Sequence, residues 1–170
     1  MSEKKINMNP IGYVRIKGEK PEQMEYFLDI HDQYRTGLKE LDKFSHVMVF
    51  WWASEMDDKE HRNLDTWAIE VPYAERAPDM GIFASRAEYR PNPIALTMCE
   101  MQSVDIKKRI VKIRGIDTFN ETPILVLKAY FPTCDRVRDC HIAPWLKDWP
   151  EYVEEGITWW QEQGFFEEAN

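Results

Sequence analysis

The stretch GIFASRAEYRPNPIALT, residues 81–97, carries the strongest signal in this sequence. It places Arg86, Arg90 and Asn92 around two prolines and then continues into an apolar segment. Each guanidinium presents a fixed set of donors that suits a carboxylate or a phosphate. The prolines fix their own φ angles and bias the residue before each of them toward extended backbone. The stretch therefore predicts either a preorganised ligand-binding loop that leads into a strand, or a surface turn with solvated arginines.

Three segments from the end of this stretch onward have the composition and length of β-strands. They are residues 94–104, 109–116 and 122–130. Turns are expected near residues 105–108 and 117–121, because both intervals contain polar and charged residues. Several short strands with turns at this spacing indicate a barrel or a sandwich.

The residues before the stretch add two more predicted strands. Residues 10–17 alternate in part between apolar and polar residues, and residues 46–52 form a continuous apolar run that we interpret as a buried strand. Around residues 35–44, apolar residues recur at helical spacing and predict a short helix. Residues 54–80 are charged, contain prolines and show no period, so we expect a long functional or mobile loop.

The glycines argue against the common nucleotide-binding folds. All seven are isolated from one another, so neither a G-x-G-x-x-G motif nor a P-loop can be drawn, and we do not expect a Rossmann fold. A chain of 170 residues is most simply one mainly-β domain with peripheral short helices. We assign residues 1–140 to this domain.

Residues 141–170 differ from the rest, since they hold 1 basic and 7 acidic residues and are rich in tryptophan. Pro150 can occupy the first turn of a helix, and the acidic residues after it suit the helix dipole. Val153, Ile157 and Trp160 then recur at i, i+4 and i+7 and form an apolar stripe. We therefore predict a C-terminal helix whose stripe packs on the body or on a partner subunit.

Composition limits the cellular setting and the metal chemistry. No apolar run reaches transmembrane length and the N-terminus has no apolar signal-peptide region, so we expect a cytoplasmic protein without a membrane partner. Three cysteines are an odd count, which argues against a disulfide framework. The spacing of Cys134, Cys140 and His141 matches no common zinc pattern, so we predict no metal. Cys99 lies in a predicted strand and is expected to be a small buried apolar group.

The net charge of −8 is unevenly distributed along the chain. Residues 1–80 have a net charge of −5 and residues 141–170 one of −6, whereas residues 81–140 hold 10 basic and 7 acidic residues, a net charge of +3. Phosphate contacts dominate nucleic-acid binding, so the acidic ends oppose an RNA partner and the basic segment favours one. The strongest candidates for phosphate contacts are Lys107, Lys108, Arg109, Lys112 and Arg114.

Three blocks of this sequence, in the same order, resemble the TsaA-like family, also called the TrmO or YaeB family. The family pattern G-[VI]-F-A-[TS]-R-x-x-x-R-P-N-P-I-[GA]-L-[ST] matches without a break over residues 81–97. A second block is matched by Gly115, Asp117, Thr122, Pro123, Leu125, Lys128, Tyr130, Pro132 and Asp135. A third block includes Pro10-Ile11-Gly12 and Phe44-Ser45-His46. We therefore interpret the chain as a member of this family.

The resemblance implies a small β-barrel that binds S-adenosylmethionine (SAM) and differs from the usual methyltransferase fold. It also implies N6-methylation of threonylcarbamoyladenosine beside the tRNA anticodon, a homodimer, and a SAM pocket that borders the two-fold interface. The loop of residues 81–95 and the block of residues 115–130 would line this pocket. SAM-dependent methylation of a small-molecule acceptor and a non-catalytic SAM-binding role are the alternatives.

Individual roles within these segments follow from side-chain chemistry. The residues predicted to contact SAM are Phe83, Arg86, Tyr89, Arg90, Asn92, Pro93, Thr122, Lys128 and Tyr130. Guanidinium and amide groups suit the SAM carboxylate, and aromatic rings suit its adenine and its sulfonium. Asn92 and Asp117 are the predicted catalytic residues, because an amino acceptor must lose a proton to a nearby oxygen. Each of two residues has a structural alternative to its functional role. Asp117 could be a turn residue that bonds its own backbone, and Tyr130 could be a core aromatic.

Two positions depart from the family pattern L-D-I-K-P-Y, since Val126 replaces its aspartate and Ala129 replaces its proline. The missing carboxylate is either a lost contact to SAM or to the acceptor, or one half of a lost structural pair. It bears on the tRNA activity more than on SAM binding. His46 opens a predicted strand and is expected to be a hydrogen-bonded structural histidine.

Overall fold

The computed structural model describes the chain except residues 1–5, 65–77, 79 and 163–170. Contacts between residues divide the chain into two units. The first unit combines Met1–Leu64 with Arg86–Arg136, and the second combines Asp65–Ser85 with Val137–Asn170. All β-strands found in the described residues belong to the first unit.

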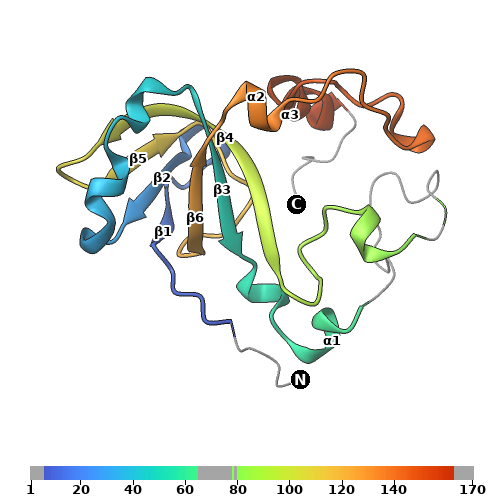
Figure 1. Cartoon of the computed structure of the whole chain (residues 1–170), viewed down its shortest axis with the longest axis horizontal. Coiled ribbons are helices and arrows are strands. Elements are labelled where there is room, and N and C mark those ends of the chain that lie inside the picture. The colour runs from blue at the N-terminus through green and yellow to red at the C-terminus, as the bar shows by residue number, and fades with distance from the viewer. Residues whose placement is uncertain (1–5, 65–77, 79, 163–170) are drawn as a thin grey trace. The chain divides into compact units, whose positions relative to one another are not determined.

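Six antiparallel strands of the described residues close into a barrel (Figure 1). They are β1 (Gly12–Lys17), β2 (Glu25–Ile30), β3 (His46–Trp52), β4 (Ile94–Asp105), β5 (Ile110–Ile113) and β6 (Pro123–Ala129). Around the barrel the order is β1-β2-β5-β4-β3-β6, and β6 pairs with β1 to complete the circle. The predicted small β-barrel is thus confirmed, and the fold is not a Rossmann fold. The five strands that the sequence predicts correspond to β1, β3, β4, β5 and β6.

Strand β4 is long enough to pair with two neighbours in succession. Residues 94–100 pair with β3, residues 101–105 pair with β5, and the register shifts between Met101 and Ser103. An irregularity of this kind bends a strand and increases its local twist. The bend in β4 therefore helps to turn the sheet back on itself, which closure of a barrel requires.

Alternation along the strands separates a buried inner face from an outer face. In β3, the side chains of Val47, Val49 and Trp51 point into the core and are at most 5% exposed, whereas the residues between them are only partly buried. Residues 46–52 are therefore a strand as predicted, but only one of its faces belongs to the core. The fully buried core side chains include Val14, Leu28, Val47, Val49, Val111 and Ile124. Burial of an apolar side chain of this size stabilises a fold by about 1.5–3 kcal/mol.

The sequence analysis does not predict β2, whose residues EYFLDI include two carboxylates. Both carboxylates meet a cation from a neighbouring strand: Nζ of Lys112 lies 2.5 Å from Oε1 of Glu25, and Nε of Arg15 lies 3.6 Å from Oδ2 of Asp29. The alternate residue Leu28 is buried in the core. Because β2 lies between β1 and β5, its cross-strand neighbours supply the charges that its acidic residues need.

The helices of the first unit are short. They are η1 (Pro21–Gln23), η2 (Asp32–Leu38), η3 (Leu41–Lys43), η4 (Ser54–Met56), α1 (Lys59–Arg62) and α2 (Pro132–Asp135), where η denotes a 3-10 helix. The single helix predicted around residues 35–44 is wrong, because Glu40 adopts a left-handed conformation with a φ of 62° and separates η2 from η3. The loop predicted over residues 54–80 begins with η4 and α1, and most of its remainder lies outside the described residues.

The second unit contains further short elements and the C-terminal helix. Its described elements are η5 (Ile82–Ala84), η6 (Pro144–Leu146) and α3 (Val153–Glu162). The predicted C-terminal helix is thus present, and the rings of Trp149 and Trp159 contact each other with centroids 5.4 Å apart. The side chains of Ile157 and Trp160 lie outside the described residues, so the apolar stripe stays a prediction. None of the helices in the described parts of the chain has the length and apolarity that crossing a bilayer requires.

Candidate functional site

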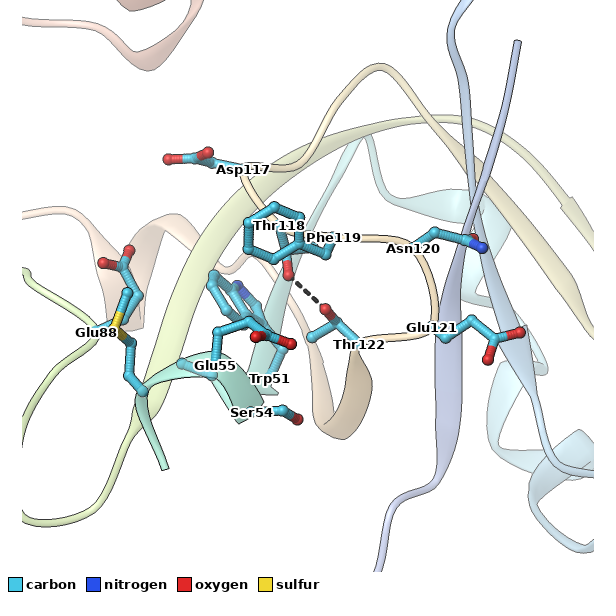
Figure 2. Close-up of a pocket in the computed structure, with 12 residues that line it drawn as sticks. Trp51, Ser54, Glu55, Glu88, Asp117, Thr118, Phe119, Asn120, Glu121 and Thr122 are labelled. Carbon is cyan, nitrogen blue, oxygen red and sulfur yellow. Dashed lines mark hydrogen bonds between the residues drawn. The ribbon is translucent and has the colours of Figure 1, made fainter. Parts of the chain in front are cut away.

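A pocket of about 270 Å³ lies in the first unit at one end of the barrel. Its wall combines the end of β3 with η4, one residue of the loop before β4, and the loop that joins β5 to β6 (Figure 2). The lining residues are Trp51, Ala53, Ser54, Glu55, Met56, Glu88, Asp117, Thr118, Phe119, Asn120, Glu121 and Thr122. Ligand pockets usually have volumes of roughly 300–1,000 Å³, so this pocket suits a small ligand or part of a larger one.

The loop between β5 and β6 is fixed to strand β1. The backbone N–H of Val14 donates to the Thr122 carbonyl over 2.9 Å, and the Val14 carbonyl accepts from the Glu121 N–H over 2.8 Å. The Asn120 side chain accepts a further hydrogen bond of 2.8 Å from a backbone N–H of β1. Within the loop, the Thr118 hydroxyl donates to the Thr122 hydroxyl over 2.7 Å (Figure 2). These bonds hold the loop in one conformation beside the pocket.

Both arginines of residues 81–97 donate to backbone carbonyls, Arg86 to one in β4 and Arg90 to one in the loop before it. The guanidinium of Arg86 donates to the Leu96 carbonyl over 2.8 Å. The Nε of Arg90 donates to the Ala87 carbonyl over 2.7 Å. A guanidinium has five N–H donors, so one such bond does not exhaust its capacity. The arginines can therefore stabilise the turn and still bind a ligand, so both interpretations of this stretch agree with the structure.

The other predicted residues of this loop differ in exposure. Pro93 is buried, and its carbonyl accepts from the Ala53 N–H over 2.8 Å. Tyr89 is buried as well. Asn92 is exposed, and its carbonyl accepts from the Ile94 N–H over 2.7 Å. Pro93 and Tyr89 thus position the loop through packing, whereas the side chain of Asn92 is accessible to a ligand.

The pocket brings together two residues predicted for the site and two that the sequence analysis missed. Asp117 and Thr122 belong to the predicted set, whereas Glu88 and Trp51 do not. Glu88 occupies a variable position of the family pattern, and Trp51 lies in an apolar run, so neither carries a signal of function by itself. An acidic residue between Arg86 and the second arginine of the loop is the one sign that could have pointed to Glu88.

The other predicted residues do not line this pocket, neither the five in the loop before β4 (Arg86, Tyr89, Arg90, Asn92 and Pro93) nor the three described next. Lys128 is exposed on the outer face of β6, with its Nζ 5.7 Å from the centroid of a phenylalanine ring on β3. Tyr130 follows the other end of β6, where its N–H donates to the His46 carbonyl over 3.0 Å. Strands rise about 3.3 Å per residue, so Tyr130 and Thr122 are roughly 26 Å apart along the chain. Phe83 belongs to the second unit and is 83% exposed.

Cys99 and His46 both have structural environments, one through burial and the other through a hydrogen bond. Cys99 is 2% exposed, and burial raises the pKa of its thiol to about 12, so it is a buried group as predicted. Cys134 and Cys140 are exposed free thiols. His46 is hydrogen-bonded through Nδ1 to the Ser45 hydroxyl over 2.9 Å. In the described part of the chain, no three His, Cys, Asp or Glu side chains are grouped so that they could hold a metal ion.

The pocket is acidic. Its lining includes Glu55, Glu88, Asp117 and Glu121, and none of the lining residues is a lysine or an arginine. Burial raises the pKa of the Glu88 carboxyl above its usual value; its own backbone N–H opposes this shift, and the charge of Asp117 adds to it. Figure 2 shows the carboxylates of Glu88 and Asp117 on the same side of the pocket. This arrangement suits a ligand with positive charge, which would offset the repulsion between neighbouring carboxylates.

The proteins similar to this chain include two curated relatives and a solved structure. A protein of Archaeoglobus fulgidus named "Probable S-adenosyl-L-methionine-binding protein" is 29% identical over 121 residues, which are 71% of this chain and 30% of that protein. The tRNA (adenine(37)-N6)-methyltransferase of Escherichia coli is 36% identical over 101 residues, which are 58% of this chain and 41% of that enzyme. A crystal structure of TrmO aligns with a TM-score of 0.62 at 24% identity, over 82% of this chain and 64% of that one, which supports the fold alone. The chain thus spans less than half of the length of either curated relative.

The family match covers the barrel. The model of the family described as "tRNA-methyltransferase O N-terminal domain" matches residues 14–136, from β1 to the residue after α2. These residues include every strand from β2 to β6 and both loops that meet at the pocket. This chain therefore belongs to the tRNA-methyltransferase O N-terminal domain family.

Proposed function

We propose that this chain is a SAM-dependent methyltransferase that acts on tRNA, at N6 of threonylcarbamoyladenosine next to the anticodon. The observation that carries the proposal is the meeting of two blocks of the family pattern, around Glu88 and around residues 117–122, at one pocket (Figure 2). The names of the relatives support it, since one is named a SAM-binding protein and another a tRNA adenine methyltransferase.

The side chains of the pocket fit SAM. SAM carries a sulfonium and an ammonium group, and an acidic lining favours both positive charges. Trp51 and Phe119 offer aromatic surface for the sulfonium or for the adenine. In the adjacent loop, Arg86 has further donors that suit a carboxylate. When bound, SAM supplies a methyl group that its positively charged sulfur activates for transfer.

Oxygen atoms of this chain supply the proton acceptor that the reaction needs. An adenine amino group must lose a proton when it gains a methyl group. Asp117 lines the pocket and is exposed, so we assign this role to its carboxylate. Asn92 is exposed in the loop before β4, and its amide would orient the acceptor.

We further propose a homodimer in which the second copy completes the pocket. The support is the separation of the predicted SAM contacts, because Thr122 lies at the pocket and Tyr130 lies roughly 26 Å away along the chain. Two copies related by a two-fold axis can place the end of β6 of one copy beside the pocket of the other. The pocket volume of about 270 Å³ agrees with a site that a second copy completes. Light scattering at micromolar concentration tests this proposal, and a monomer would contradict it.

Four of the five basic side chains predicted to contact tRNA phosphates form ion pairs within the chain. Lys112 and Arg114 each place a nitrogen 2.5 Å from a glutamate oxygen, and Nζ of Lys108 lies 3.5 Å from Oδ2 of Asp105. A phosphate would have to displace the carboxylate from each of these pairs, although an exposed pair contributes only about 0–1 kcal/mol to stability. We therefore expect tRNA binding to depend on few phosphate contacts.

A methyl acceptor other than tRNA is the second candidate, with a non-catalytic SAM-binding role beside it. The acidic pocket and the net charge of −8 favour this alternative. Val126, which replaces the family aspartate, is 40% exposed opposite Phe50 and does not line the pocket. The missing carboxylate therefore changes the outer surface of the barrel and not the pocket.

Transfer of a radiolabelled methyl group from SAM distinguishes the two candidates. The full chain is incubated with tRNA that carries threonylcarbamoyladenosine and, in parallel, with tRNA that lacks it. Label in the modified adenosine alone supports the proposal, and Asp117→Asn should reduce this labelling. If calorimetry shows SAM binding while neither tRNA is labelled, the tRNA assignment is wrong and the second candidate replaces it.

A further inference from the structure

Trp52, Asp57 and Arg62 form a polar network near the loop of residues 86–93. The indole Nε1 of Trp52 donates to Oδ2 of Asp57 over 2.9 Å, and Nε of Arg62 donates to Oδ1 of Asp57 over 2.5 Å. The guanidinium of Arg62 also lies over the Trp52 ring, 5.4 Å from its centroid. The hydrogen bond from Arg62 is the main reason why the pKa of Asp57 lies below its usual value. Together these contacts fix the direction of the Arg62 side chain.

The same guanidinium reaches the loop that precedes β4. Nη1 of Arg62 donates to the Pro91 carbonyl over 2.9 Å, between residues that are 29 positions apart in the sequence. Pro91 stands between Arg90 and Asn92, which are both predicted site residues. Residues 86–93 form neither helix nor strand, so their conformation depends on bonds of this kind.

The local sequence DDKEHR explains how Arg62 reaches this position. Asp58 caps α1, because its Oδ1 accepts from the backbone N–H groups of Glu60 and His61 over 2.8 and 3.0 Å. Asp57 is then left to bind Arg62 at the end of the same helix. The two adjacent aspartates thus have different roles, since Asp58 caps the start of α1 and Asp57 orients Arg62 at its end.

We propose that Arg62 is a positioning residue that holds residues 86–93 in the conformation in which Glu88 faces the pocket. The inference rests on the proposed function, because it makes Arg62 a determinant of SAM affinity without contact to SAM. A guanidinium can bind the Asp57 carboxylate and the Pro91 carbonyl at once through different nitrogens. The single ammonium of a lysine cannot reproduce this geometry, so Arg62→Lys should behave as a loss of the link.

Hydrogen exchange in the whole 170-residue chain tests the positioning role without any ligand. Arg62→Met keeps a long apolar stem and removes both bonds, and Asp57→Asn removes the charge that orients the arginine. We expect faster exchange of the amides at residues 87–90 in Arg62→Met, in Arg62→Lys and in Asp57→Asn. Exchange in β1 and β4 should stay unchanged, which shows that the barrel is intact.

Arg35→Met is the matched control. Arg35 is also an arginine at the last turn of a short helix, and it pairs with Asp32 three residues earlier. It is not part of the pocket or of the loop before β4. This variant should leave exchange at residues 87–90 as in the parent protein.

Calorimetry with SAM then measures the effect on the site. Loss of one charge-assisted hydrogen bond should raise the Kd for SAM about tenfold or more in Arg62→Met, and Arg35→Met should bind like the parent. Unchanged exchange at residues 87–90 in Arg62→Met would overturn the positioning role. Faster exchange with unchanged SAM affinity would overturn its importance for the site. If the parent does not bind SAM, the proposed function fails, whereas the exchange data still decide whether Arg62 positions the loop.

Discussion

Glu88 and Asp117 face one pocket from two separate loops, and burial, together with the charge of Asp117, raises the pKa of the Glu88 carboxyl. A cation placed between them would lower the cost of keeping both groups ionised. The pocket therefore selects for positive charge, and its affinity and its contribution to stability should both depend on pH.

Glu88→Gln should make the protein more stable at neutral pH and its stability less dependent on pH. A carboxyl whose pKa is raised in the folded state binds more protons there than in the unfolded state. Stability is therefore lost as the pH rises from the usual value of 4.5 through the raised value. Thermal unfolding over roughly pH 4–8 measures this loss in the parent and its absence in the variant. Glu22→Gln changes an exposed glutamate and serves as the control; identical pH profiles for all three proteins would contradict the expectation.

SAM binding should strengthen as the pH rises through the raised pKa of Glu88. The ionised carboxylate attracts the sulfonium and the ammonium group, whereas the protonated carboxyl does not. Calorimetry at several pH values measures the trend in the parent protein. In Glu88→Gln the dependence in this pH range should disappear, and a dependence equal to that of the parent would assign it to another group.

Leu28→Ala should lower the free energy of unfolding by about 2–5 kcal/mol. Leu28 is fully buried in β2, so the substitution leaves a cavity in the barrel core. Urea unfolding followed by tryptophan fluorescence measures the loss. Val126→Ala removes an apolar side chain that is 40% exposed and should cost far less. Similar losses for both variants would show that Leu28 is not a core residue.

Two of the three cysteines should react with a thiol reagent in the native protein. Cys134 and Cys140 are exposed, whereas Cys99 is buried and has a thiol pKa of about 12. Titration with Ellman's reagent should therefore give two fast equivalents, and a third only after denaturation. Cys134→Ser should reduce the fast count to one, and three fast equivalents in the native protein would contradict the burial of Cys99.

The salt dependence of tRNA binding should reveal which lysine and arginine side chains contact phosphates. Lys107→Ala removes an exposed lysine from the turn between β4 and β5 and should lower the slope of log K against log salt by about one unit. Arg114→Ala should change the slope less, because Arg114 already binds Glu100 through two hydrogen bonds. Filter binding at several salt concentrations measures both slopes. Equal changes for the two variants would show that the ion pair opens when RNA binds.

Most of the barrel could be predicted because the local sequence pattern of most strands identifies them as strands. β3 is a continuous run of apolar residues, and β4 to β6 are separated by polar turns. β2 could not be predicted, because acidic residues are uncommon in strands. Its two carboxylates are stabilised by ion pairs with Arg15 and Lys112, which belong to other strands. The helix expected around residues 35–44 was wrong because periodicity says nothing about the left-handed residue Glu40 that interrupts it.

The candidate site was predictable only where it overlaps a recognisable pattern. Asp117 and Thr122 lie in a block of the family pattern, and the structure places both at the pocket. Glu88 and Arg62 lie at positions without a pattern, and their relevance comes from contacts to residues far away in the sequence. Such contacts depend on tertiary structure, which periodicity and composition do not contain.

The pairing of β1 with β6 has a consequence for the newly made chain. Gly12 of β1 lies opposite Ile124 of β6, so one edge of β1 stays unpaired until β6 has been synthesised. β3 also needs β6 as a neighbour, so two strand edges stay open until β6 has left the ribosome. Pairings between such distant segments form slowly, and open edges can pair with other chains in the meantime. The barrel can close only after β6 has left the ribosome, and a nascent chain that stops before β6 would leave one edge of β1 and one edge of β3 unpaired.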